Sequence, residues 1–389
     1  RYRAFLGTEL VKNNLFFDLI ARADQGTIDP FRPAGSPIAS QTGNFTTIYE
    51  YTLNPYFVSR LNGLADLTID YKYSDFLFSD DDVDPRKRQT FRADLFTDPG
   101  SSRVSWGLDG FSQKVEYEDD TRADSTRSYV DAVLRYQLNR KWRLAGSVGT
   151  ESNTYESDTQ DDTGGPRWYL EARWTPNARN IFTIRQGDRY FGSYTNVDIS
   201  HRARKSRLGV QYKTELRDTS DTLSERNILP TTDLSGQPVN PLTTGPFLTP
   251  NDFIVLTDNG LYVQDRFRAF YSLTGKKTVF DLGGIYETQD YLDSPRETIL
   301  SRAWIEVRRG LTRKYSVRTR LGWYGTEEKN TNDTSDTWRF VMSLNRPVGR
   351  KSGLSISYSY ADRESNLAGD SYTENRVALF FNTSYQGIP

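Results

Sequence analysis

The sequence predicts an all-β protein, a single antiparallel transmembrane β-barrel of about 18 to 22 strands. Three observations carry this prediction. Polar and apolar residues alternate with a period of two in one segment after another, many of these segments run for ten residues or more, and short turns alternate with longer polar loops between them. No run of about eighteen apolar residues occurs, so the sequence contains no candidate for a membrane-spanning helix.

The alternation is clearest from Ala65 to Ser74, where every second residue from Ala65 is apolar or aromatic and the residues between are polar. Similar segments begin at Val130, Trp142, Trp168 and Leu354. Successive side chains of a strand point to opposite faces, so each segment has one apolar and one polar face. Charged residues in mid-strand, such as Arg135 and Arg173, predict that the polar face meets water rather than a packed core.

The connections supply the second argument, because their lengths alternate. The short connections are residues 12–14, 62–63, 98–101, 139–141, 176–179, 203–205, 274–277 and 309–313. The longer ones are residues 25–43, 79–87, 119–125, 157–164, 290–296 and 326–336. Barrels of the Gram-negative outer membrane have short periplasmic turns and longer extracellular loops, so the pattern predicts that location. The longest connection, residues 219–258, is expected to act as a plug in the lumen or a lid over its mouth.

The composition agrees with a chain that lies between water and lipid. Hydrophobic residues make up only 36% of the chain, which is low for several packed cores, whereas 13% aromatic residues argue against disorder. The 50 basic and 51 acidic residues lack the net basic charge of a nucleic-acid-binding protein. Because there is no cysteine, zinc-ligand spacing, phosphate-binding glycine loop or nucleotide fingerprint, we expect no metal site and no cofactor.

We predict one domain over residues 1–389, with about nineteen strands. Bacterial barrels have an even number of strands, and the first strand here, near residues 2–10, would run from the extracellular side to the periplasm. We therefore expect at least one further strand before Arg1. The alternative is that this count misplaces one strand boundary.

Three stretches carry a resemblance to a known family. They read Trp-Thr-Pro-Asn-Ala-Arg from Trp174, Arg-Tyr-Phe-Gly-Ser-Tyr from Arg189, and Asp-Ile-Ser-His-Arg-Ala-Arg-Lys from Asp198. Weaker matches are Glu9-Leu, Leu15-Phe-Phe-Asp and Leu53-Asn-Pro-Tyr-Phe. In these features the chain resembles the PEP-CTERM-system-associated outer-membrane protein family, which is grouped with β-barrel porins. Its members extend upstream of residue 1 and occur in bacteria with exopolysaccharide and exosortase loci, so the resemblance implies polysaccharide export or surface assembly and no established chemistry.

The inward parity of the predicted strands is rich in arginine. The candidate lumen-lining residues are Arg135, Arg143, Arg173, Arg185, Arg266, Arg268, Arg302, Arg308, Arg318 and Arg320. Mixed charge is expected in any wide barrel, where it would neutralise itself across strands. The sharper hypothesis is an anion pathway, because a fixed positive wall attracts and relays anions. It is strongest at Arg302, Arg308, Arg318 and Arg320, on two consecutive strands where we expect Glu306 as the only nearby acid.

Other candidate residues have simpler interpretations. His201 is the single histidine, and its neighbour Ser200 would point to the opposite face of the strand, so we predict no nucleophile–base pair and an interfacial or structural histidine. Acidic clusters at residues 79–84, 118–124 and 157–162 lack the spacing of a calcium loop. We expect them to be solvated, or bridged by cations to lipopolysaccharide. Outward Trp142, Trp168 and Trp174 predict an interfacial girdle.

The preferred functional hypothesis is an outer-membrane channel, a passive conduit linked to exopolysaccharide export or surface assembly. Its expected partners are outer-membrane lipids, lipopolysaccharide, an anionic polysaccharide and periplasmic export or surface proteins, without nucleic acid. The first alternative is a plugged structural barrel that anchors surface polysaccharide or a partner protein. The second is a carbohydrate-active enzyme in the lumen, which would need a carboxylate pair about 5 Å or roughly 6.5–9.5 Å apart. We identify no catalytic residues.

Overall fold

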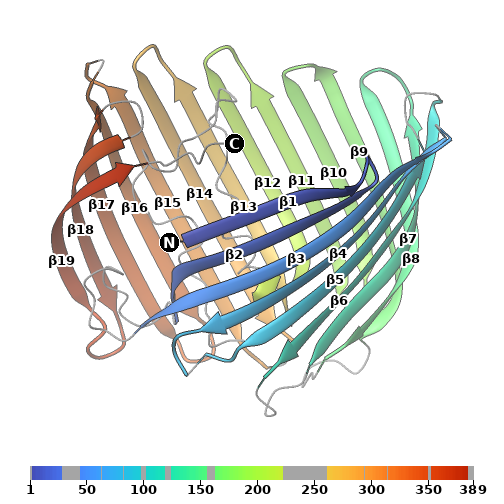
Figure 1. Ribbon diagram of the computed structural model, residues 1–389, viewed down its shortest axis with the longest axis horizontal. Helices are drawn as coiled ribbons and strands as arrows, with labels where there is room; N and C mark the ends of the chain where they lie inside the picture. The colour runs from blue at the N-terminus through green and yellow to red at the C-terminus, as the bar shows by residue number, and fades with distance from the viewer. Residues whose placement is uncertain are drawn as a thin grey trace.

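The computed structural model describes residues 2–28, 44–62, 64–81, 83–97, 102–118, 124–155, 163–221, 261–292, 294–312, 314–348 and 352–383. Within these residues, nineteen strands form one antiparallel sheet that curves round into a barrel (Figure 1). The predicted fold class and strand number are confirmed. In this part of the chain no helix has the length and apolar character needed to cross a membrane.

The strands follow one another along the chain without a crossover. They are β1 (Tyr2–Val11), β2 (Leu15–Thr27), β3 (Phe45–Leu61), β4 (Ala65–Phe78), β5 (Arg86–Thr97), β6 (Val104–Tyr117), β7 (Ser125–Gln137), β8 (Trp142–Thr154), β9 (Gly164–Asn177), β10 (Asn180–Arg189), β11 (Gly192–Arg202), β12 (Ser206–Asp218), β13 (Leu261–Thr274), β14 (Thr278–Tyr291), β15 (Glu297–Gly310), β16 (Ser316–Glu328), β17 (Asp333–Val348), β18 (Ser352–Ser365) and β19 (Tyr372–Thr383).

Each strand pairs with the next one, from β1–β2 through β18–β19, which is an up-and-down meander (Figure 1). β1 and β19 are the two edges of the sheet, and no pairing joins them within the described ranges. The further strand expected before Arg1 concerns residues outside this structure and stays a prediction.

Where the structure describes them, the predicted short turns are confirmed, whereas the turn predicted at residues 98–101 lies outside the described residues. Asn13 lies between β1 and β2, and Asn62 lies between β3 and β4, with φ angles of 60° and 48°. Asparagine adopts this left-handed conformation more readily than most residues, which allows the chain to reverse within two or three residues. At the end of the barrel opposite the short turns, β8 and β18 continue to Thr154 and Ser365, whereas the alternating segments from Trp142 and Leu354 end at Gly149 and Tyr360.

The predicted alternation sets the two faces of the sheet. On the outer face, Val148 and Leu170 are 66% and 64% exposed, as expected for side chains that contact lipid. Their inward neighbour Ser147 is buried. Trp142, Trp174 and Phe182 stack across β8, β9 and β10 at the short-turn end, with ring centroids 5.6 and 5.0 Å apart. This outward ladder fits the predicted aromatic girdle.

The described part of the chain forms no large apolar core in the interior. Two small apolar clusters lie near the loop ends of the strands. One consists of Ile28, Ile48, Phe76 and Val83, and the other of Leu216, Leu261 and Leu292. Elsewhere the buried inward side chains are mostly polar or charged, as in Glu50, Arg88 and Gln264. The inner wall is therefore held by hydrogen bonds and ion pairs, and these determine where the functional side chains point.

Candidate functional site

The first group of predicted arginines lies on β7–β10. Arg143 and Arg173 are direct partners in the β8–β9 register. Glu171 accepts hydrogen bonds from Arg185 at 2.7 and 3.2 Å, and lies 3.8 Å from the guanidinium of Arg143. The guanidinium of Arg135 packs over the ring of Phe96, 4.2 Å from its centroid. Two of these arginines, Arg143 and Arg185, thus contact one carboxylate, and each is about one-third exposed.

The second group lies on β13–β16. Arg266 pairs with Glu287 at 2.9 Å, and Arg268 packs over the ring of Phe270. Arg308 and Arg318 are register partners, and both contact Glu306, at 3.2 and 2.7 Å. The remaining members, on the same inward parity, are Arg302, whose register partner is Tyr324, and Arg320, which packs over Trp304.

One expectation about this second group was wrong. Glu306 is not the only acid near it, because Arg308 also donates to Asp281 of β14 at 2.8 Å. The antiparallel register places Asp281 directly opposite Glu306, a pairing that a pattern within single strands does not reveal. The structure does not merge the two groups into one ladder, since β11 and β12 separate them.

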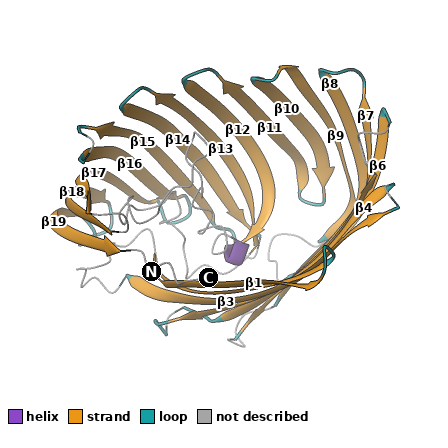
Figure 2. Cartoon of the chain, turned by 45° about the horizontal axis from the view of Figure 1, so that its top comes forward, coloured by secondary structure: helices purple, strands orange, loops and turns teal. Residues whose placement is uncertain are grey.

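A further site, which the sequence did not reveal, lies inside the curved sheet, where the end of β12 meets β5, β6 and β7. β12 pairs with β11 only from Arg207 to Lys213, whereas its pairing with β13 continues to Asp218. Residues 214–218 of β12, which we call the ribbon, therefore have β13 as their one neighbouring strand, and β13 is itself paired with β14 from Tyr262 onward. This ribbon leads to residues 219–221, which begin a helical turn inside the curved sheet (Figure 2).

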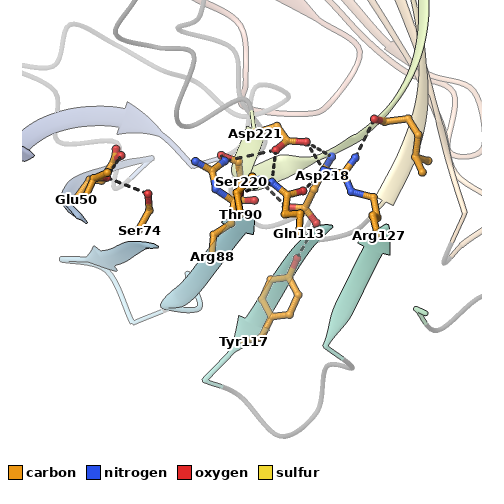
Figure 3. A network of polar contacts seen from close by, with 12 residues as sticks. Glu50, Ser74, Arg88, Thr90, Gln113, Tyr117, Arg127, Asp218, Ser220 and Asp221 are labelled. Carbon is orange, nitrogen blue, oxygen red and sulfur yellow. Dashed lines mark hydrogen bonds and ion pairs between the residues drawn. The ribbon is translucent and has the colours of Figure 1, made fainter. Parts of the chain in front are cut away.

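The ribbon is fastened to β5, β6 and β7 by a network that we call the lumenal latch, formed by Asp218, Ser220 and Asp221 with Arg88, Gln113 and Arg127 (Figure 3). The carboxylate of Asp221 accepts from Arg127 at 2.6 Å, from Gln113 at 2.9 Å and from Arg88 at 3.4 Å. Arg88 and Arg127 also donate to the carbonyl oxygens of Ser220 and Leu216, at 2.8 and 2.9 Å. The two arginines thus bind both the backbone of the segment and the side chain of Asp221.

The latch is buried and charged. Arg88, Arg127 and Gln113 are each less than one-tenth exposed, and Asp218 and Ser220 are fully buried. Burial alone would raise the pKa of the Asp221 carboxyl, but the guanidiniums of Arg127 and Arg88 outweigh that effect and hold its pKa well below the ordinary value. Asp221 therefore stays ionised. Removal of one partner from a buried ion pair strongly destabilises the structure around it, because the other charge stays buried without compensation.

The latch brings together residues that are far apart in sequence: 133 positions separate Arg88 from Asp221, and 94 separate Arg127 from it. The only sequence signal was the inward parity of Arg88 and Arg127 next to predicted loops. Of the expected plug or lid at residues 219–258, the structure describes residues 219–221, and the remainder lies outside the described residues. The acidic clusters at residues 118–124 and 157–162 likewise lie largely or wholly outside them.

Acidic side chains also lie close together elsewhere on the inner wall. Asp94, Asp109 and Asp131 lie in register on β5, β6 and β7, so acidic side chains of neighbouring strands lie side by side on the inner wall. His201 contacts Asn180 beside a short turn, and no trio of acidic, histidine or cysteine residues in the described ranges is placed to bind a metal ion.

No protein-family model and no curated protein sequence matches the chain. Similarity appears only among solved structures. The siderophore receptor PirA from Acinetobacter baumannii gives a TM-score of 0.52 at 8% identity, over 96% of this chain and 69% of the receptor. The siderophore receptor PirA from Pseudomonas aeruginosa and the copper transporter OprC each give 0.50, at 8% and 10% identity, over 97% of this chain and 68% and 70% of their own. These similarities establish the outer-membrane β-barrel fold and nothing finer.

Proposed function

We propose that this outer-membrane barrel is a channel for anionic solutes, and that its cellular passenger is an acidic polysaccharide in export or surface assembly. The observation that carries the proposal is the charge of the inner wall. Guanidiniums gather in two groups, on β7–β10 and on β13–β16, where they form ion pairs with Glu171, Asp281, Glu287 and Glu306. Partly exposed guanidiniums on a wet wall, such as those of Arg143, Arg185 and Arg308, raise the local concentration of anions beside them.

The wall also offers the two kinds of contact that an acidic sugar uses. Guanidinium groups bind carboxylates with paired donors, and aromatic rings pack against the apolar faces of sugar rings. Arg185 lies 4.3 Å from the ring centroid of Tyr169, and Arg167 lies 4.0 Å from that of Tyr129, on inward positions of β7, β9 and β10. The resemblance to the PEP-CTERM-associated family supports the link to exopolysaccharide, which remains part of this proposal.

Single-channel recording of the purified protein in a planar bilayer tests the proposal. We expect open steps whose reversal potential in a KCl gradient reports anion preference, and current block by oligogalacturonate added to one side. A neutral maltooligosaccharide of equal length serves as the control for size. Cation preference, or equal block by the two sugars, would reject an arginine-lined anion pathway.

The lumenal latch favours a second candidate function, a closed scaffold that anchors surface polysaccharide or a partner protein. A ribbon fastened to β5–β7 from β12 occupies space in the lumen. Under this candidate the wild-type barrel is silent in the bilayer under every condition. The two candidates are therefore separated by the same recording.

A further inference from the structure

The lumenal latch has the composition of an anion-binding site that is occupied by the chain itself. Two guanidiniums and one amide, from three neighbouring strands, converge on the two oxygens of the Asp221 carboxylate. Arg127 and Gln113 also contact each other, so the donors are positioned before any ligand is considered. Such a cradle binds carboxylates in general and does not require that the carboxylate belong to an aspartate.

The segment that supplies Asp221 is attached more weakly than the cradle that receives it. Arg88, Gln113 and Arg127 lie in strands paired on both sides, whereas the ribbon of β12 has lost β11 as a partner beyond Lys213. Outside the cradle, hydrogen bonds tie the ribbon to the wall, from Tyr117 to Asp218 at 3.4 Å and from the Thr214 amide to Asn196 Oδ1 at 3.2 Å. The cluster of Leu216, Leu261 and Leu292 also packs against Tyr155, Tyr190 and Phe191. Release of the ribbon therefore leaves the cradle itself intact.

We propose that the cradle of Arg88, Gln113 and Arg127 is a lumenal carboxylate-binding site, and that the uronate groups of an acidic saccharide displace Asp221 from it and release the ribbon at the end of β12. The inference deepens the proposed function, on which it rests for the nature of the ligand. The transported saccharide would then itself open the channel through which it passes. The exchange involves no covalent step: one carboxylate replaces another on the same donors, so the charge of the cradle stays balanced.

Ser220 provides a readout that does not depend on conduction. The chain has no cysteine, and the Ser220 side chain is fully buried in the latch. In a Ser220→Cys variant, a water-soluble maleimide should react slowly while the latch is closed. Oligogalacturonate at constant ionic strength should accelerate labelling, and a neutral maltooligosaccharide of equal length should not.

Asp221→Asn in the Ser220→Cys background should make labelling fast without any sugar. Loss of the carboxylate leaves two buried guanidiniums facing each other, and the population of the open ribbon should rise on the order of 100-fold. Asp198→Asn is the matched control, since Asp198 faces the lumen from β11 and has Gln211 as a partner at 3.4 Å, outside the latch. That variant should label as slowly as Ser220→Cys alone and should respond to oligogalacturonate in the same way.

Two results would overturn the inference. Labelling that oligogalacturonate leaves unchanged shows that Asp221 is a permanent structural anchor, even where the bilayer experiment finds an anion channel. Equally fast labelling of Ser220→Cys with and without Asp221→Asn shows that the latch does not hold the ribbon. If the barrel proves silent to all solutes while oligogalacturonate still accelerates labelling, the proposed channel fails and the carboxylate site stands.

Discussion

The ion selectivity of the lumen should depend on the register pair Arg143 and Arg173 of β8 and β9. The perturbation is the double substitution Arg143→Gln with Arg173→Gln. It removes two positive charges from the inner wall and keeps side chains that donate hydrogen bonds. Arg185 keeps its contact with Glu171, so the ion pair that organises this part of the wall remains.

The expected size of the effect follows from the positions of these charges on the wall of the lumen. A chloride ion that passes about 5 Å from each guanidinium gains about 0.8 kcal/mol from each charge in water. Screening over a Debye length of about 10 Å leaves roughly 1 kcal/mol for the pair. The same charges repel potassium by a similar amount, so we expect the permeability ratio of chloride to potassium to fall roughly thirtyfold.

The assay is the reversal potential of the variant in a planar bilayer under a KCl gradient. Lys87→Gln with Arg309→Gln is the control, because both residues are exposed and lie on outward positions of β5 and β15. This control removes the same charge from the outer face and should leave the ratio unchanged. An unchanged ratio in the lumenal variant, or an equal change in both, would refute the assignment of selectivity to the inner wall.

Three further predictions concern stability and the lumen. Trp174→Ala, which removes two stacked ring contacts on the outer face, should lower the free energy of unfolding in detergent by about 1–3 kcal/mol, measured by urea titration of tryptophan fluorescence. Gly149→Ala should destabilise the barrel by about 1–3 kcal/mol in the same assay, because the new Cβ would collide with the Val130 carbonyl oxygen, whereas Gly146→Ala meets its nearest neighbour at 3.5 Å and should be tolerated. Deletion of residues 219–258 removes Ser220 and Asp221 from the latch and should raise single-channel conductance; an unchanged conductance would reject a constriction at this loop.

Much of the wall was predictable because a membrane strand is a local pattern. Ala65–Ser74 and the segment from Val130 already show which side chains face lipid, and the structure places Val130 and Leu134 on the exposed outer face. The inward parity of Arg135 and Arg173 followed from the same period of two. Strand ends were less predictable, since β18 continues beyond Tyr360 to Ser365, where the apolar signal has stopped.

The sequence by itself determined the barrel, its two faces and its short turns, because each depends on the order of neighbouring residues and on the opposite directions of successive side chains. Only the tertiary structure decided which charged side chains form ion pairs with one another. Register placed Asp281 beside Arg308, and the departure of β12 from β11 carried Asp221 to Arg88 and Arg127. These contacts join distant parts of the chain across strands and across the lumen, and no periodicity within a strand specifies its partners in space.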